Sequence, residues 1–153
     1  RIEAFLISLF TFVIILIYSS YSEAPNEIHT MIRKEAKAQG LDPELAVAVA
    51  IVESGLDPEA IGSLGEIGVF QLRPKYHDVR YGDSKHNIRI AVSYLIEMKN
   101  KCSRYPGLSW VNCYNHGPYR TVKFPLKFPY YKKVYAEYVS QKHLQLSLIT
   151  KNN

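Results

Sequence analysis

One acidic residue stands in an unusual place in this sequence of 153 residues. Glu53 directly follows eight apolar residues, Leu45 to Val52, in a segment expected to be a helix too apolar to face water. Burial raises the pKa of a carboxyl group, and the negative end of the helix dipole raises it further. A carboxylic acid kept partly protonated near neutral pH can act as a general acid in cleaving a glycosidic bond. The alternative is a structural glutamate that is satisfied by backbone donors or by a lysine.

The elements that must position Glu53 are predicted to be mostly helical. A first helix is expected over residues 26–39, where apolar side chains recur at helical spacing. The apolar helix that carries Glu53 begins after Asp42, whose side chain can cap it, and ends at Gly55. An apolar helix of this kind is expected to lie at the centre of the domain.

The second half of the chain is predicted to be loops followed by further helices. Residues 56–72 contain three glycines, which favours loops or a small hairpin. An amphipathic helix is expected next, then a short helix, a loop rich in proline and lysine, and a last polar helix, at residues 87–101, 109–115, 117–129 and 130–146. The predicted fold class is therefore mainly α, with a small irregular or β element after Glu53.

The first residues form a separate, apolar segment. Ala4 to Tyr18 carries no charge, and at about 1.5 Å per residue it is shorter than a hydrocarbon core of about 30 Å. Its length is typical of a signal peptide, with small residues for cleavage at residues 20–22, and an uncleaved membrane anchor is the alternative. Either interpretation directs the remaining chain out of the cytoplasm.

The net charge of +5 is unevenly distributed. Between Lys99 and Lys142 there are nine lysines and arginines and a single acid, Glu137. Such a bias indicates an acidic partner (nucleic acid, anionic lipid or an acidic wall polymer) or simply a solvated basic face. Export from the cytoplasm argues against nucleic acid as the partner.

The two cysteines, Cys102 and Cys113, are compatible with one disulfide in an oxidising compartment or with two buried thiols. Neither lies in a CxxC spacing and no histidine pair completes a ligand set, so no zinc site is expected. No other cofactor is expected either.

Several motifs in order resemble the soluble lytic transglycosylase (SLT) domain, which has a lysozyme-like fold. They are Glu53-Ser54-Gly55, Gly68-Val69-Phe70-Gln71, the helix segment at 87–95, Cys113-Tyr114-Asn115-His116-Gly117-Pro118, and the closing segment at 128–138. The similarity covers roughly residues 27–138. It implies an α+β lysozyme-like catalytic domain at residues 23–140, between a signal peptide or anchor at 1–22 and a polar tail at 141–153.

The resemblance implies a role for each matching residue. Glu53 matches the catalytic acid and base, and Ser54 matches a serine close to the reacting sugar. The remaining matches are to residues that shape the cleft or contact the acetamido sugar: Gly68, Gln71, Tyr114 and Asn115. Tyr131 is the best match to a tyrosine that hydrogen-bonds the catalytic glutamate, with Tyr130 as the alternative.

The sequence also departs from the family pattern. Val69-Phe70 replaces an apolar pair, residues 90–92 lack the usual glycine, and Cys113 and His116 replace alanines. These changes affect the details of the sugar subsites. Cys113 could be tied back to the preceding helix through Cys102.

Most glycosidases use two carboxylates. The other acids between Glu53 and Gln71 are Asp57, Glu59 and Glu66. Glu66 could point into the cleft as a second catalytic group, although the family has a small residue there. With one carboxylate, the family chemistry implies cleavage between N-acetylmuramic acid and N-acetylglucosamine with a 1,6-anhydro product.

Other interpretations remain open at this stage. Water could intercept the same intermediate, as in a lysozyme-type hydrolase or a phage endolysin. The domain could also be a peptidoglycan-binding part of a secretion, conjugation or phage assembly. The expected partner is the peptidoglycan strand, with membrane contact through the first segment. The expected location is the periplasm or the periplasmic face of the inner membrane, for a protein of bacterial or phage origin.

Overall fold

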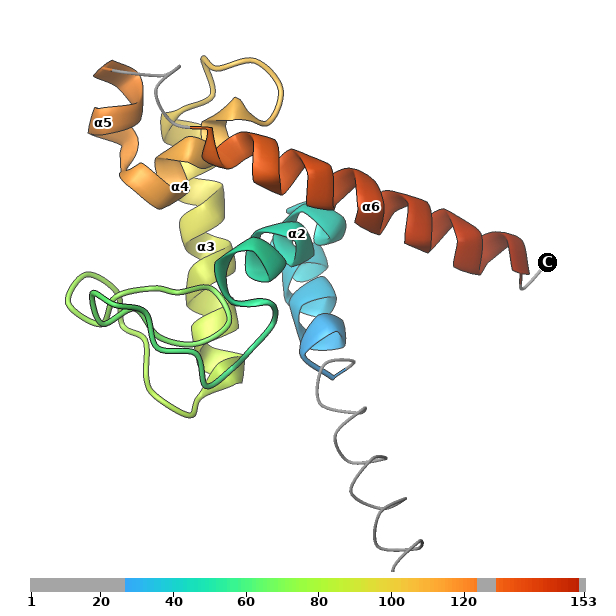
Figure 1. Ribbon diagram of the computed structural model, residues 1–153, viewed down its shortest axis with the longest axis horizontal. Coiled ribbons are helices and arrows are strands. Elements are labelled where there is room, and N and C mark those ends of the chain that lie inside the picture. Colours follow the sequence, from blue (N-terminus) through green and yellow to red (C-terminus); the bar gives the residue numbers. More distant parts are fainter. Residues whose placement is uncertain (1–26, 124–128, 152–153) are drawn as a thin grey trace, which may run out of the picture.

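The computed structural model describes residues 27–123 and 129–151 and is mainly helical (Figure 1). Residues 27–38 are helical, and they are followed by α2 (Pro43–Ser54), α3 (Ser84–Lys101), the 3-10 helix η1 (Ser109–Val111), α4 (Asn112–His116), α5 (Pro118–Lys123) and α6 (Tyr130–Lys151). Among these residues, β pairing consists of isolated antiparallel bridges from Ile67 to Ile61 and to Leu72. The predicted mainly α fold with a small β element after Glu53 is confirmed.

Helix α2 lies at the centre of the fold. The side chain of Asp42 accepts a hydrogen bond from the Glu44 N–H, and Pro43 occupies the first turn, where its missing N–H leaves no donor unsatisfied. Residues 44–50 are buried, so the apolar run has no side that faces water. Gly55 ends the helix in the left-handed conformation, at φ 66°, and its N–H bonds to Ile51. The chain therefore turns sharply just after Glu53.

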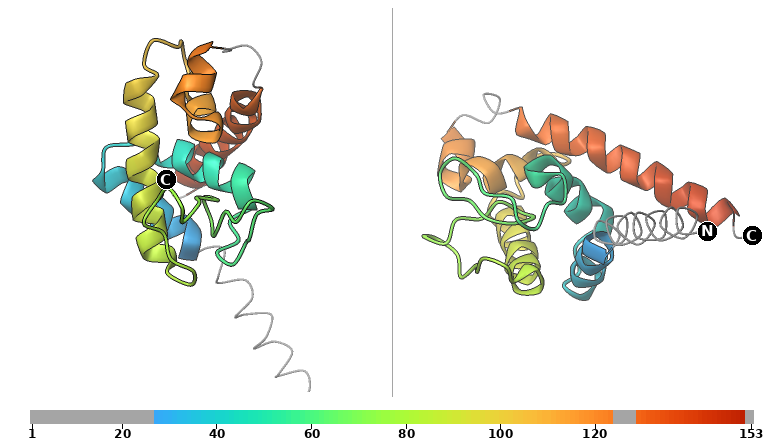
Figure 2. Two further views of the ribbon diagram at one scale, coloured as in Figure 1. Left: turned by 90° about the vertical axis from the view of Figure 1, so that its left-hand side faces the viewer. Right: turned by 60° about the horizontal axis from the view of Figure 1, so that its bottom comes forward.

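Helix α6 packs across α2 and continues beyond it (Figures 1 and 2). Val134 is fully buried in this contact. The Tyr138 hydroxyl donates to Asp42 over 2.8 Å, and Lys142 forms an ion pair with the same carboxylate at 2.9 Å. The residue that caps α2 thus also holds α6 in place.

The start of α6 is held by a different helix. The Asn112 side chain, buried in α4, accepts a hydrogen bond from the Tyr131 N–H at 2.9 Å. A free N–H in the first turn of a helix needs such a partner. Asn112 therefore fixes where α6 begins and which way its first side chains point.

Three helix boundaries differ from the predicted ones. Helix α3 begins at Ser84, because Asp83 accepts a hydrogen bond from the His86 N–H and caps it there. The predicted loop at 117–129 contains α5, which starts at Pro118, a residue well suited to a first helical position. The last helix runs to Lys151 instead of ending near Leu146.

The apolar segment at residues 4–18, interpreted as a signal peptide or anchor, lies outside the described residues. Among the helices of residues 27–123 and 129–151, none combines the length and apolar character that a membrane span requires.

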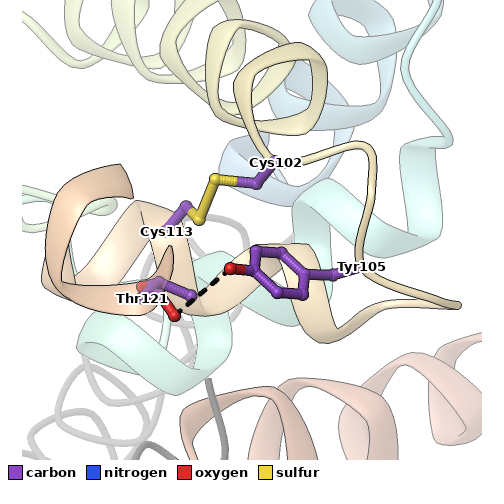
Figure 3. The surroundings of a disulfide bond; sticks show 4 residues. All are labelled: Cys102, Tyr105, Cys113 and Thr121. Atoms are coloured by element: carbon purple, nitrogen blue, oxygen red, sulfur yellow. Dashed lines mark hydrogen bonds between the residues drawn. A yellow bond between two sulfur atoms is a disulfide. The ribbon is translucent and has the colours of Figure 1, made fainter. Parts of the chain in front are cut away.

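A disulfide joins Cys102, at the end of α3, to Cys113 in α4 (Figure 3). Both residues are fully buried. Beside the disulfide, the Tyr105 hydroxyl donates to the backbone oxygen of Thr121 in α5 (Figure 3). The interpretation of the two cysteines as a bonded pair is confirmed, and the bond ties α4 to the end of α3.

Replacing both Cys102 and Cys113 with alanine should lower the free energy of unfolding by about 3 kcal/mol. The two residues are 11 positions apart, and without the disulfide the loop between them is no longer closed in the unfolded chain. Chemical denaturation with and without a reducing agent measures the effect. Reductant should destabilise the wild-type protein and leave the double variant unchanged. Equal stability of the two proteins under oxidising conditions would contradict the prediction.

Candidate functional site

Glu53 lies in the last turn of α2 and faces a cleft of about 610 Å³. The loop between α2 and α3 forms one side of the cleft, and α3 and α4 form the other. Besides Glu53, its lining residues are Gly62, Ser63, Glu66, Gln71, Leu72, Arg73, Tyr76, His77, Tyr94, Tyr114, Asn115, His116 and Gly117.

A second hollow, of about 320 Å³, opens on the side of Glu53 that faces α6. Glu53, Asn115 and His116 line both hollows, and Tyr130 and Lys133 of α6 line only the second one. The carboxyl group therefore lies between two spaces. An extended chain could occupy both spaces and pass over this carboxyl.

The Glu53 carboxyl has two hydrogen-bond partners from different elements. The Tyr130 hydroxyl donates to Oε1 at 2.5 Å, and the Asn115 side chain is the second partner. Burial raises the pKa of Glu53, these hydrogen bonds lower it again, and the negative charge of Glu66 raises it. Burial dominates, so the net shift is upward. The two partners orient the Glu53 carboxyl group, and its raised pKa favours the protonated form that can act as a general acid.

Tyr130 itself remains a phenol across the accessible pH range. Burial, together with the neighbouring charge of Glu53, raises its pKa well above the ordinary tyrosine value. It can therefore donate to the carboxylate form of Glu53 without competing for the proton that Glu53 transfers.

Hydrogen bonds from side chains to backbone hold the segment 68–71, which brings Gln71 to the cleft, against α2 and the loop that follows it. The Ser54 hydroxyl donates to the Val69 carbonyl at 2.8 Å, and the Gln71 amide donates to the carbonyls of Gly68 and Ala60 at 2.9 and 3.2 Å. Gln71 has a positive φ of 48°, a backbone conformation that residues other than glycine rarely adopt without support from their surroundings.

An aromatic wall, formed by His77, Tyr94 and Tyr114, lines the cleft beyond Glu53. The Tyr94 ring lies 4.4 Å from the His77 ring and 5.3 Å from the Tyr114 ring, centroid to centroid. Tyr114 is fixed by a buried hydrogen bond of 2.7 Å from its hydroxyl to the Phe70 carbonyl. Burial lowers the pKa of His77 more than Glu97 raises it, so this ring is neutral near pH 7. The wall offers flat, uncharged surfaces next to the acid.

The family model for the transglycosylase SLT domain matches residues 30–127. The chain belongs to the transglycosylase SLT domain family. Its substrate class at the level of the family is peptidoglycan. No curated protein sequence matches the chain.

Within this SLT domain, the structure brings together Glu53, Gln71, Tyr114 and Asn115 at the cleft, as the motifs predict. The two other motif residues contact protein. The Ser54 hydroxyl bonds to the Val69 backbone, and the tight approach at Gly68 is to the Pro58 carbonyl, 3.4 Å from where a Cβ would lie. Contacts of these residues with a sugar stay a prediction.

The expected tyrosine partner of Glu53 needs a correction. Tyr130, the alternative, makes the hydrogen bond to Glu53, whereas Tyr131 provides the backbone N–H that Asn112 binds. Adjacent helical residues point about 100° apart, so only one of the two can reach the carboxyl. The sequence does not reveal which one, because the rotation of α6 depends on its contacts with α2 and α4. Tyr130 also lies outside the residues that the SLT family model matches.

Several further cleft residues were not predicted, among them Arg73, Tyr76, His77 and Tyr94. Tyr94 falls in a recognised motif but has no role assigned by it. The other three follow Gln71 within six residues, and an aromatic cluster directly after a cleft motif is the signal that could have identified them. Within the described part of the chain, His, Cys, Asp and Glu side chains form no group of three that could hold a metal ion.

Tyr130→Phe should shift the alkaline limb of the pH profile of kcat/KM to higher pH. The Tyr130 hydroxyl stabilises the charged form of Glu53, so its removal raises the pKa of that carboxyl and preserves the acid form at higher pH. Tyr131→Phe is the matched control and should leave the limb in place. A limb that does not move in the Tyr130 variant would rule out this assignment.

Glu53→Gln should raise the melting temperature at pH 8 and lose this advantage in acid. The raised pKa means that the folded protein holds the proton more tightly than the unfolded chain, so the wild-type protein loses stability as pH rises through that pKa. Glutamine has no charge to bury. Melting curves between pH 4 and pH 8 measure the difference, and a variant that is less stable at every pH would refute the explanation.

Proposed function

We propose that this chain is a lytic transglycosylase that cleaves the β-1,4 bond between N-acetylmuramic acid and N-acetylglucosamine and leaves a 1,6-anhydro end. The observation that carries the proposal is the carboxyl group of Glu53 at the end of the buried helix α2, which borders two hollows and is hydrogen-bonded by Tyr130 and Asn115. On this proposal the two hollows hold the sugars on the two sides of the cut bond, and Glu53, which lines both, acts on the oxygen between them.

In the first step, Glu53 donates its proton to the oxygen of the glycosidic bond, which breaks as the leaving sugar departs with its electron pair. The cation that develops at C1 of the muramic sugar is shielded by the carbonyl oxygen of its own N-acetyl group. Asn115, which lines both hollows, is placed to orient that group. Tyr130 stabilises the carboxylate that Glu53 becomes.

In the second step, the Glu53 carboxylate takes the proton of the C6 hydroxyl, and the C6 oxygen bonds to C1. Glu53 recovers its proton, so atoms and charges balance without a water molecule. Glu66, the other acid in the cleft, favours this route because it is engaged by Arg73 and by the Leu64 N–H. Desolvation raises the pKa of Glu66 slightly, but these hydrogen bonds lower it overall, so Glu66 stays a carboxylate.

Hydrolysis in the same cleft is the second candidate. Its support is that Glu66 lines the same cleft as Glu53, but to activate a water Glu66 would first have to release Arg73. The two candidates share Glu53 as the acid and differ only in the chemical end of the product. We also propose that residues 1–22 direct the domain out of the cytoplasm, to the compartment that holds peptidoglycan.

Glu53→Gln should reduce the release of soluble fragments from purified sacculi by about a hundredfold or more, because it removes the general acid. Glu59→Gln, a change of the same kind at an exposed residue that does not line the cleft, is the control and should keep full activity. Mass spectrometry of the wild-type products should find 1,6-anhydro ends. Reducing ends would establish hydrolysis instead, and undiminished release by the Glu53 variant would overturn both candidates.

A further inference from the structure

The loop between α2 and α3, which forms one side of the cleft, carries a charged pair. Arg73 donates from Nε to Oε1 of Glu66 at 2.8 Å, and the second Glu66 oxygen accepts from the Leu64 N–H at 3.0 Å. Both side chains line the cleft, with 34% of Arg73 and 20% of Glu66 exposed. The pair therefore lies where a bound chain would pass.

The local backbone leaves room for this pair. A Cβ on Gly62 would lie 2.4 Å from a Glu66 oxygen and 2.7 Å from Oε1 of Gln71. Any other residue at position 62 would push the Glu66 carboxylate out of its place. Gly62, Leu64 and Glu66 together fix the position of one edge of the Arg73 guanidinium.

Glu66 engages only one of the nitrogens of Arg73. In the part of the chain that the structure describes, the guanidinium bonds through Nε alone, which leaves the donors of both Nη groups for a ligand in the cleft that Arg73 lines. A pair of parallel N–H donors matches the two oxygens of a carboxylate, and arginine binds such groups bidentately. Because Glu66 already orients the Arg73 guanidinium, binding a carboxylate there would cost less side-chain entropy.

We propose that Arg73 binds a carboxylate on the lactyl arm of the glycan, and thereby selects acidic, muramic-acid-containing strands over neutral N-acetylglucosamine polymers. The proposal rests on the proposed function. The chemistry at Glu53 needs only an N-acetyl group, which neutral polymers also carry, so it does not discriminate between them. Arg73 supplies that discrimination, and Glu66 is a positioning residue that acts through Arg73.

The carboxylate has two possible sources. In strands without stem peptides, the lactyl group ends in its own carboxylate. In strands that carry stem peptides, the lactyl carbonyl is an amide, and the carboxylates belong to the peptide. Both present the same chemistry to Arg73 and are distinguished below.

Binding can be separated from cleavage in the Glu53→Gln protein, by titration with three soluble ligands of equal length. These are strands with stem peptides, the same strands after enzymatic removal of the peptides, and N-acetylglucosamine oligomers. Adding Arg73→Gln should weaken binding of one or both acidic ligands by roughly tenfold and change binding of the neutral oligomer by less than about twofold. Loss on the peptide-free strands alone identifies the lactyl carboxylate, and loss on the peptide-carrying strands alone identifies the peptide. Loss on both shows that Arg73 accepts a carboxylate from either source.

Lys75→Gln is the matched control, since it removes the same charge from an exposed residue of the same loop that does not line the cleft. It should change no affinity. Arg73→Lys, which keeps the charge and loses the paired donors, should be intermediate. Affinity for the acidic ligands should fall with added salt in the parent protein and fall less in the Arg73→Gln variant.

Equal affinities with and without Arg73, equal loss on the neutral oligomer, or the same loss in the Lys75 variant would each overturn the inference. Retained binding of the neutral oligomer shows that the variant is folded. Failure of the proposed function gives a different result, because the wild-type protein would then release no fragments with 1,6-anhydro ends from sacculi, whatever Arg73→Gln does to binding.

Discussion

The burial of one carboxyl group at the end of an apolar helix is the constraint on which the rest of this structure depends. Helix α2 has no side that faces water, so Glu53 can be reached only where the helix stops. Gly55 stops it by adopting the left-handed conformation, and the chain that follows becomes one side of the cleft. The cost of desolvating the carboxyl also raises its pKa, which favours the protonated form that the first chemical step requires.

The surrounding helices hold the hydrogen-bond partners of the Glu53 carboxyl in place. The disulfide from Cys102 fixes α4, and α4 in turn supplies Asn115 to Glu53 and Asn112 to the start of α6. That contact sets the rotation of α6 and brings the Tyr130 hydroxyl to Glu53. The hydrogen bonds on the catalytic group therefore depend on a chain of contacts through two short elements, and the disulfide is part of the site as well as of the fold.

Glu66 illustrates how an acidic side chain in a cleft can be something other than an acid catalyst. Its carboxylate is occupied by Arg73 and by a backbone N–H, and Gly62 provides the space it needs. These three residues form one unit: the glycine allows the carboxylate, and the carboxylate orients the guanidinium. A cation oriented in this way suits a substrate that carries its own negative charge.

The amino-acid sequence by itself determined that Glu53 ends a buried helix and that the fold is mainly helical, because apolar runs, caps and glycine stops act locally. The resemblance of the motifs predicted that Glu53, Gln71, Tyr114 and Asn115 meet at one cleft. Tertiary structure alone decided that Tyr130 rather than Tyr131 reaches the carboxyl, that Ser54 bonds to backbone, and that Glu66 is paired with Arg73. Each of these depends on the rotation or approach of one element relative to another. Contacts distributed over the whole domain set such rotations, and no short stretch of residues encodes them.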